Sequence, residues 1–275
     1  TGSGWQNSTA SFTNTPVSVT GQIDFARAAR GVKIAGSTLT FIPYARDAVG
    51  VIYYDHSTGH LSSLTTAQLN ALYSSSTGTL TIGGDTVHAC LTLLGSTPRT
   101  NLETAIGVTD STAAIAANAA GCNGIEQNNA NAFYAFASAL PAGSDAVIPI
   151  SSASWIGQDN GVGVDRSSTA RAGGADLASI DSLGKPYTGT VPNELPNPTY
   201  YASTSYGYNV YTAVPTNKVT GGFGDAGLKS LFVGSSSALC SAPAQATANQ
   251  FGFASFTGLL SGLATCGSTS TQGNG

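Results

Sequence analysis

Residues 91–100, Leu-Thr-Leu-Leu-Gly-Ser-Thr-Pro-Arg-Thr, place hydroxyls and a guanidinium where a strand is expected to lead into a helix. The apolar run Val87–Leu94 predicts a buried strand, and a helical pattern begins near Thr100. Backbone N–H groups at a helix N-terminus favour an anion, and an arginine fork adds charged donors. The segment predicts an oxyanion contact made by Ser96, Thr97, Arg99 and Thr100. The alternative interpretation is an ordinary helix-capping turn.

Arginine is scarce and unevenly placed in this chain. Three of the six arginines, Arg27, Arg30 and Arg46, fall within residues 27–46. Arg27 and Arg30 are spaced to share one face of a helical segment, which indicates either a solvated surface or a second group of anion donors. Asp47 follows Arg46 directly. Its carboxylate could pair with that arginine, cap a turn, or accept a hydrogen bond from a protonated ligand oxygen.

Catalytic patterns are absent from the sequence. The three histidines, His56, His60 and His88, are accompanied by no Gly-x-Ser-x-Gly element, and there is no P-loop or Gly-x-Gly-x-x-Gly motif. His88 alternates with apolar residues, so a half-buried structural role is favoured. His56 and His60 stand four apart in a Gly/Ser loop and could form a metal pair, but this interpretation is disfavoured because the nearby carboxylates are limited to Asp55. We therefore predict a protein that is not an enzyme, with no metal and no cofactor.

The composition narrows the choice of partner and compartment. Only 9% of the 275 residues are charged, against about 25% in an average soluble protein, and the net charge is −4. A nucleic-acid partner is therefore not expected. The four cysteines lack any C-x-x-C pair, and their even number and wide spacing suit two disulfides formed in an oxidising compartment. Of three possible pairings, the sequence-local Cys90–Cys122 and Cys240–Cys266 are favoured.

Strand and helix patterns alternate along the chain, which indicates an α/β protein. Strand patterns over residues 38–44 and 49–54 flank the polar Arg46-Asp47 pair, and they predict one extended segment that crosses between lobes. Residues 64–73 predict a helix with a capping box formed by Thr65 and Gln68.

An ordered series of short motifs resembles the phosphate-binding proteins of ABC importers, in the form found in secreted actinobacterial relatives. The motifs are Ile23-Asp-Phe-Ala-Arg27, Phe41-Ile-Pro-Tyr-Ala-Arg-Asp-Ala-Val49, Leu64-Thr-Thr-Ala-Gln-Leu69, Gly95-Ser-Thr-Pro-Arg-Thr100 and Ala153-Ser-Trp-Ile-Gly-Gln158. The resemblance implies a two-lobed type II periplasmic-binding-protein fold with crossover hinge strands. We expect residues 1–48 with 158–275 in lobe 1, and residues 49–157 in lobe 2.

The resemblance also implies a function. The chain would be an extracellular solute-binding-like protein, secreted or at the cell surface, that holds phosphate or another small oxyanion in an inter-lobe cleft. An ABC permease or an extracellular assembly would be its protein partner. The implied ligand-binding residues are Ser96, Thr97, Arg99, Thr100, Asp24, Arg27, Arg30 and Asp47.

Three positions depart from the family pattern. Pro98 replaces a threonine, and Ala28 and Ala29 stand where the family has a serine and an aspartate. Each lost charge-assisted hydrogen bond is worth roughly 1.5–3 kcal/mol. The alternative is therefore a binding-protein fold with a degenerate cleft, serving as a structural or adhesive component of an extracellular assembly.

Overall fold

The structure is a computed structural model, and it describes residues 24–29, 38–56, 59–220, 224–256, 260 and 264–270. The chain divides into two compact units. The small unit comprises Thr1–Tyr44, Asn209–Ser241 and Thr265–Gly275, and the large unit comprises Ala45–Tyr208 and Ala242–Ala264. The lobe boundaries expected from the sequence, at residues 48/49 and 157/158, stay a prediction. The compact units group residues 158–208 with residues 49–157.

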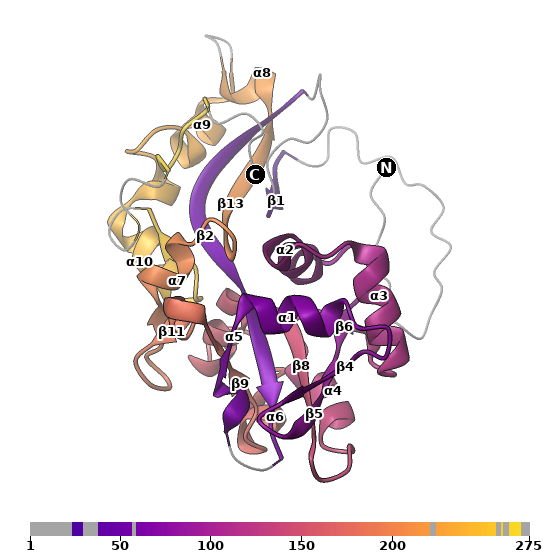
Figure 1. Cartoon of the computed structure of the whole chain (residues 1–275). Helices are drawn as coiled ribbons and strands as arrows, with labels where there is room; N and C mark the ends of the chain where they lie inside the picture. The colour runs from indigo at the N-terminus through magenta and orange to yellow at the C-terminus, as the bar shows by residue number, and fades with distance from the viewer. Residues whose placement is uncertain are drawn as a thin grey trace. The chain divides into compact units, whose positions relative to one another are not determined.

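Two strands contribute residues to both units. Strand β2 (Leu39–Tyr54) is one continuous strand of 16 residues, drawn in Figure 1 as a long indigo-to-purple ribbon. Its residues up to Tyr44 belong to the small unit and those from Ala45 belong to the large unit. Strand β13 (Gly207–Pro215) is divided in the same way after Tyr208. The two strand patterns that flank Arg46-Asp47 are therefore parts of a single crossover strand, as predicted.

The small unit is built on a strand ladder with short helices. Strand β13 lies between β1 (Ala26–Ala28) and β2, and it pairs with β1 in the antiparallel sense. The other elements are α8 (Thr216–Val219), α9 (Ala226–Phe232) and the 3-10 turn η3 (Ala238–Cys240). Ile42 and Val214 from the strands pack with Phe232 from α9 in a buried apolar cluster.

The large unit has a mixed sheet at its centre. The second half of β2 runs antiparallel to β8 (Ser144–Ser151), β8 is parallel to β5 (Asp85–Ala89), and β5 is antiparallel to β4 (Thr79–Ile82). The shorter strands are β3 (Ser63–Leu64), β6 (Leu91–Thr92), β7 (Asn123–Ile125), β9 (Asp176–Leu177), β10 (Ser179–Ile180), β11 (Tyr187–Thr188), β12 (Leu195–Pro196) and β14 (Ala254–Ser255). Both β9 and β14 pair with β2.

Helices cover the strands of the large unit in two groups. Helices α1 (Thr66–Tyr73), α2 (Thr97–Ile106) and α3 (Asp110–Ala119) contact one another, as Figure 1 shows in purple and magenta. Helices α4 (Ala130–Ala137) and α5 (Ser152–Asp159) contact β8, and α6 (Ser168–Ala172) contacts α4. The remaining helical elements are α7 (Pro198–Ala202), α10 (Ala242–Gln250), η1 (His60–Ser62) and η2 (Asp181–Leu183).

Local sequence signals account for the ends of several helices. The predicted capping box is present at α1, where the Thr65 side chain accepts from the Gln68 N–H and the Gln68 side chain accepts from the Thr65 N–H. Helix α3 begins after Thr109 and α4 after Asn129, whose side chains also accept N–H bonds. These residues satisfy N–H groups that the first helical turn leaves without a carbonyl.

The prediction of one continuous strand over Val87–Leu94 is wrong. The structure has two strands there, because the chain changes partners at Cys90: β5 pairs with β4 and β8, whereas β6 pairs with β7. Cys90 is bonded to Cys122, the residue directly before β7, with the sulfur atoms 2.00 Å apart. An apolar run shows burial but not a change of neighbour, so the sequence pattern could not detect the break.

The two expected cysteine pairs both lie at bonding distance. The second pair, Cys240–Cys266, has an S–S distance of 1.96 Å and lies within the small unit. Among the described residues, none of the helices is long and apolar enough to traverse a lipid bilayer.

Phe133 lies at the centre of the core beside β8, with no exposed surface, among Trp155, Ile148 and Leu177. Truncating Phe133 to alanine should lower the free energy of unfolding by about 3–5 kcal/mol, since it removes buried apolar surface and leaves a cavity. Ile115 on α3 is 59% exposed and serves as the control, with an expected change within about 0.5 kcal/mol for Ile115→Ala. Urea denaturation of the two variants measures both values. Equal losses would contradict this account of the core.

Candidate functional site

The predicted oxyanion segment forms the N-terminus of α2. Gly95 lies in the turn between β6 and α2 and takes a left-handed backbone conformation, with φ 78°. Ser96 is the N-cap residue, but its side chain does not cap the helix; its hydroxyl bonds to that of Thr92, at 2.6 Å. Pro98 has no N–H, so the backbone donors of this first turn come from Thr97 and Arg99. The turn keeps a capacity to bind an anion through two amides.

Arg99 is only 3% exposed and serves as a centre of internal contacts. Its Nε donates to Glu103 at 3.1 Å and to Asp110 at 2.8 Å. Its Nη1 donates to the carbonyl oxygen of Thr92 and to the side-chain oxygen of Asn123, both at 3.1 Å. These bonds join α2, α3, β6 and β7. The guanidinium therefore holds the loop in place.

The remaining hydroxyls of this segment differ in their availability. Thr100 is half-buried, and its hydroxyl donates to the carbonyl of Ser96 at 3.2 Å. Thr97, the first residue of α2, is also half-buried. The structure thus brings together Ser96, Thr97, Arg99 and Thr100 in one turn, and it gives internal partners to the side chains of three of them.

Asp47 lies in β2 and is completely buried. Its carboxylate accepts hydrogen bonds from the hydroxyls of Ser151 and Tyr208, both at 2.6 Å, and from the amides of Ala48 and Ala153, at 2.7 and 3.0 Å. Burial raises its pKa, and the four hydrogen bonds oppose that shift. The arrangement ties β2 to the start of α5. The predicted role of Asp47 as a ligand residue stays a prediction, beside this structural role.

The other predicted ligand residues belong to the small unit. Asp24 forms an ion pair with the ammonium of Lys218 at 2.7 Å. The helical segment expected at Arg27 is wrong: Arg27 lies in strand β1 with an exposed side chain, opposite Thr212 in β13, because this segment pairs with a neighbouring strand. Arg30 lies outside the described residues. Their participation in binding stays a prediction.

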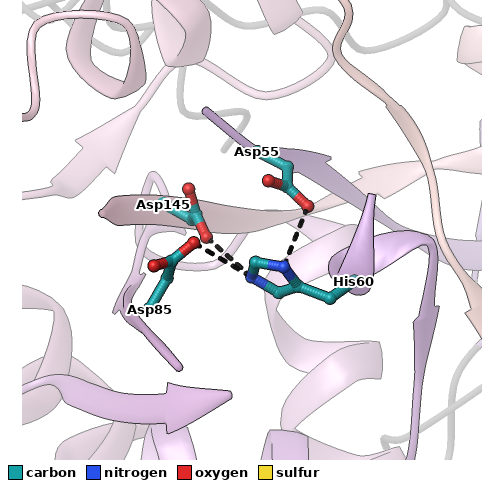
Figure 2. A group of neighbouring side chains, drawn as sticks. All are labelled: Asp55, His60, Asp85 and Asp145. Carbon is teal, nitrogen blue, oxygen red and sulfur yellow. Dashed lines mark hydrogen bonds and ion pairs between the residues drawn. The ribbon is translucent and has the colours of Figure 1, made fainter. Parts of the chain in front are cut away.

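A second group of chemically capable side chains was not predicted as a set. Asp55, His60, Asp85 and Asp145, here called the His60 cluster, converge in the large unit (Figure 2). Their potential ligand atoms all lie within 4.8 Å of one another. Of these three aspartates, only Asp55 is close to His60 along the chain. Asp85 and Asp145 join them through the pairing of β5 with β8 and of β8 with β2, which no local spacing could show.

Comparison with known proteins supports the fold at low sequence identity. No protein-family model matches the chain, and no curated protein matches it. The chain is similar to the structure of a protein from Clostridium perfringens, assigned as a phosphate ABC transporter substrate-binding protein and solved with bound phosphate. The TM-score is 0.56 and the identity 12%, covering 86% of this chain and 81% of the other.

A second solved structure, a phosphate binding protein from Stenotrophomonas maltophilia, gives a TM-score of 0.37 at 10% identity. That match covers 70% of this chain and 64% of the other chain, less than two thirds of its length. The match to the Clostridium perfringens protein supports the mixed α/β fold of this chain. Low identity limits the likeness to the fold, and the residues of this chain must carry any argument about its ligand.

Glu103 supplies a test of the Arg99 centre. Burial, with a smaller contribution from the negative charge of Asp110, raises the pKa of Glu103 from 4.5 to about 7. The folded state therefore keeps this proton at pH values where the unfolded chain has released it. The contribution of Glu103 to the free energy of unfolding should therefore decrease as the pH rises from about 4.5 to about 7.

Glu103→Gln should remove this component of the pH dependence while it leaves an acceptor for Arg99. Urea denaturation of both proteins between about pH 4.5 and pH 8 measures it: the stability of the wild type relative to Glu103→Gln should fall across that range. Glu126→Gln, which alters a partly exposed carboxylate paired with Arg166, is the matched control. A constant difference between wild type and Glu103→Gln would contradict the assignment.

Proposed function

We propose that this protein is a solute-binding-like protein that binds phosphate or a similar small oxyanion, with the N-terminus of α2 as a principal contact. The observation that carries the proposal is the match of fold to a substrate-binding protein solved with bound phosphate, over 86% of this chain. That structure is of a binding protein, and the proposal is accordingly one of binding without catalysis.

The chemistry of the α2 turn supports an oxyanion as the ligand. The amides of Thr97 and Arg99 begin a helix of 10 residues, whose dipole favours negative charge. The Thr97 hydroxyl adds a donor at the same turn. The Arg99 guanidinium is engaged by internal acceptors, among them the Asp110 carboxylate, so the amides and the Thr97 hydroxyl are proposed as the direct contacts.

The other predicted ligand residues enter the proposal as additional donors from the small unit, namely Arg27 and Arg30. The position of the ligand in a cleft between lobes, which the sequence resemblance implies, stays a prediction. An exported protein is proposed because both cysteine pairs are at disulfide distance, which suits an oxidising compartment. An ABC permease is the proposed partner of a binding protein of this class.

Isothermal titration calorimetry with phosphate, sulfate and small organic acids tests the proposal. We expect heat of binding with at least one of these anions. Thr97→Val keeps the side-chain shape and removes the hydroxyl, and it should weaken binding about 10- to 100-fold, as expected for a lost hydrogen bond to a charged group. Thr104→Val, which alters an exposed threonine of the same helix, is the control and should bind within about twofold of wild type.

The absence of heat with every anion at millimolar concentration would contradict the proposal. Equal affinity in Thr97→Val and wild type would contradict the assignment of the α2 turn as the contact.

A second candidate function is a structural or adhesive component of an extracellular assembly. The observation that favours it is the reduced donor set of the α2 turn: Pro98 lacks an N–H, and the hydroxyls of Ser96 and Thr100 bond within the protein. Sedimentation analysis of the purified chain distinguishes the two candidates. A stable polymer without anion binding would support this second function, whereas a monomer that binds phosphate would exclude it.

A further inference from the structure

We propose that the His60 cluster binds a divalent transition-metal cation of the Zn²⁺ class. Its four side chains come from the end of β2, from η1, from the start of β5 and from the start of β8. All four lie in the large unit, and the three carboxylates face the imidazole of His60, as Figure 2 shows. The site is separate from the α2 turn and would be a second function of this unit.

Strand register is what gathers the three carboxylates. Tyr54 in β2 pairs with Ala146 in β8, which brings the following Asp55 beside Asp145. Val87 in β5 is opposite Asp145, two residues along from Asp85. Like charges on adjacent strands repel, and Asp145 has no exposed surface. A cation among these oxygens offsets both the repulsion and the cost of burial.

The distances at His60 fit the edges of a metal coordination polyhedron. Nε2 lies 3.2 Å from Oδ2 of Asp145 and 3.5 Å from Oδ2 of Asp85. Bonds of about 2.0 Å from Zn²⁺ to nitrogen and oxygen give tetrahedral ligand–ligand distances of about 3.3 Å. Nε2 therefore lies at a ligand–ligand distance from each of the two carboxylate oxygens, and the potential ligand atoms of the cluster all lie within 4.8 Å of one another.

The second ring nitrogen of His60 has a carboxylate beside it, as is common for histidines that bind a metal. Nδ1 of His60 lies 3.8 Å from Oδ2 of Asp55, the oxygen that also accepts the N–H of Leu61. A carboxylate beside the second ring nitrogen orients a ligating histidine and selects its tautomer. Gly83, in the turn between β4 and β5, leaves room for the ring: a Cβ there would lie 2.6 Å from Cγ of His60.

His56 gives an independent indication that a partner belongs at this place. Its Nδ1 is buried and has no hydrogen-bond partner, and it lies 3.8 Å from Oδ1 of Asp145, too far for such a bond. The backbone N–H of the same residue donates to that Oδ1 at 2.9 Å, so His56 is tied to the cluster. A cation bound by Asp145 would place a positive charge near this nitrogen, which has no hydrogen-bond partner in the protein.

The ligand types select the class of cation. Imidazole nitrogen with carboxylate oxygens in four-coordinate spacing suits Zn²⁺ or Co²⁺, whereas Ca²⁺ and Mg²⁺ prefer all-oxygen sites with six or more ligands. The remaining interpretation is a histidine that serves only as an ionic and hydrogen-bonding bridge between the three aspartates. That interpretation predicts no specific metal binding. A metal titration therefore distinguishes it from the proposed site.

The full chain, freed of metal by chelation, is titrated with Zn²⁺ by calorimetry and with Co²⁺ by visible absorption, in a buffer without phosphate. We expect one equivalent to bind and the Co²⁺ complex to show the intense visible bands of a four-coordinate site. His60→Gln and Asp85→Asn should each weaken binding at least about 100-fold, and Asp55→Asn about 10- to 100-fold, the range for a residue that supports a ligand.

His88→Gln is the matched control, since it removes a histidine of β5 that is outside the cluster, and it should bind as wild type does. Asp85 is partly exposed, so Asp85→Asn remains informative if His60→Gln does not fold, and the thermal unfolding of each metal-free variant checks this. No binding by the wild type, or equal binding by wild type and Asp85→Asn, would overturn the proposal. Because phosphate is absent, either result leaves the proposed oxyanion function to its own test.

Discussion

The structure of the large unit depends on how two adjacent charged residues are buried in the middle of β2. Arg46 donates to the backbone carbonyls of Tyr201, Ser203 and Gly207, at 2.5–2.9 Å. Asp47 accepts four hydrogen bonds, two of them at the start of α5. Burial of a charge is costly unless its hydrogen bonds are satisfied, and here both charges are satisfied. A polar pair thus fixes which segments lie against the crossover strand.

The same use of charge recurs through a protein with few charged residues. Arg99 joins two helices and two strands from a buried position. Glu194 and Asp159 form a close carboxyl pair, in which burial and the negative charge of Asp159 raise the pKa of Glu194 to about 8. Arg171 forms an ion pair with Asp159, at 2.5 Å. Several of the few ionisable side chains therefore connect elements in the interior of the large unit.

This use of charge bears on both proposed sites. At the α2 turn, internal bonding of Arg99 leaves backbone amides as the donors for an oxyanion, which suits a neutral, hydrogen-bonding mode of recognition. At the His60 cluster, three carboxylates face one imidazole, which suits a cation. The two sites differ in the sign of the charge they favour, and they rest on different elements, α2 and the ends of β2, β5 and β8. A binding protein could therefore carry an oxyanion and a metal without competition between them.

Four features could be predicted from the sequence alone: the α/β class, the capping box of α1, the crossover strand through Arg46-Asp47 and the helix that begins at the Gly-Ser-Thr turn. Each of these follows from periodicity or from a cap within a few residues, where chain connectivity already sets the geometry. Long-range packing, in contrast, gives Arg99 its internal partners, gives Asp47 its four hydrogen bonds, and makes the chain change strand partners at Cys90. It alone brought Asp85 and Asp145 to His60, because strand register joins residues far apart in the chain and leaves no local spacing in the sequence.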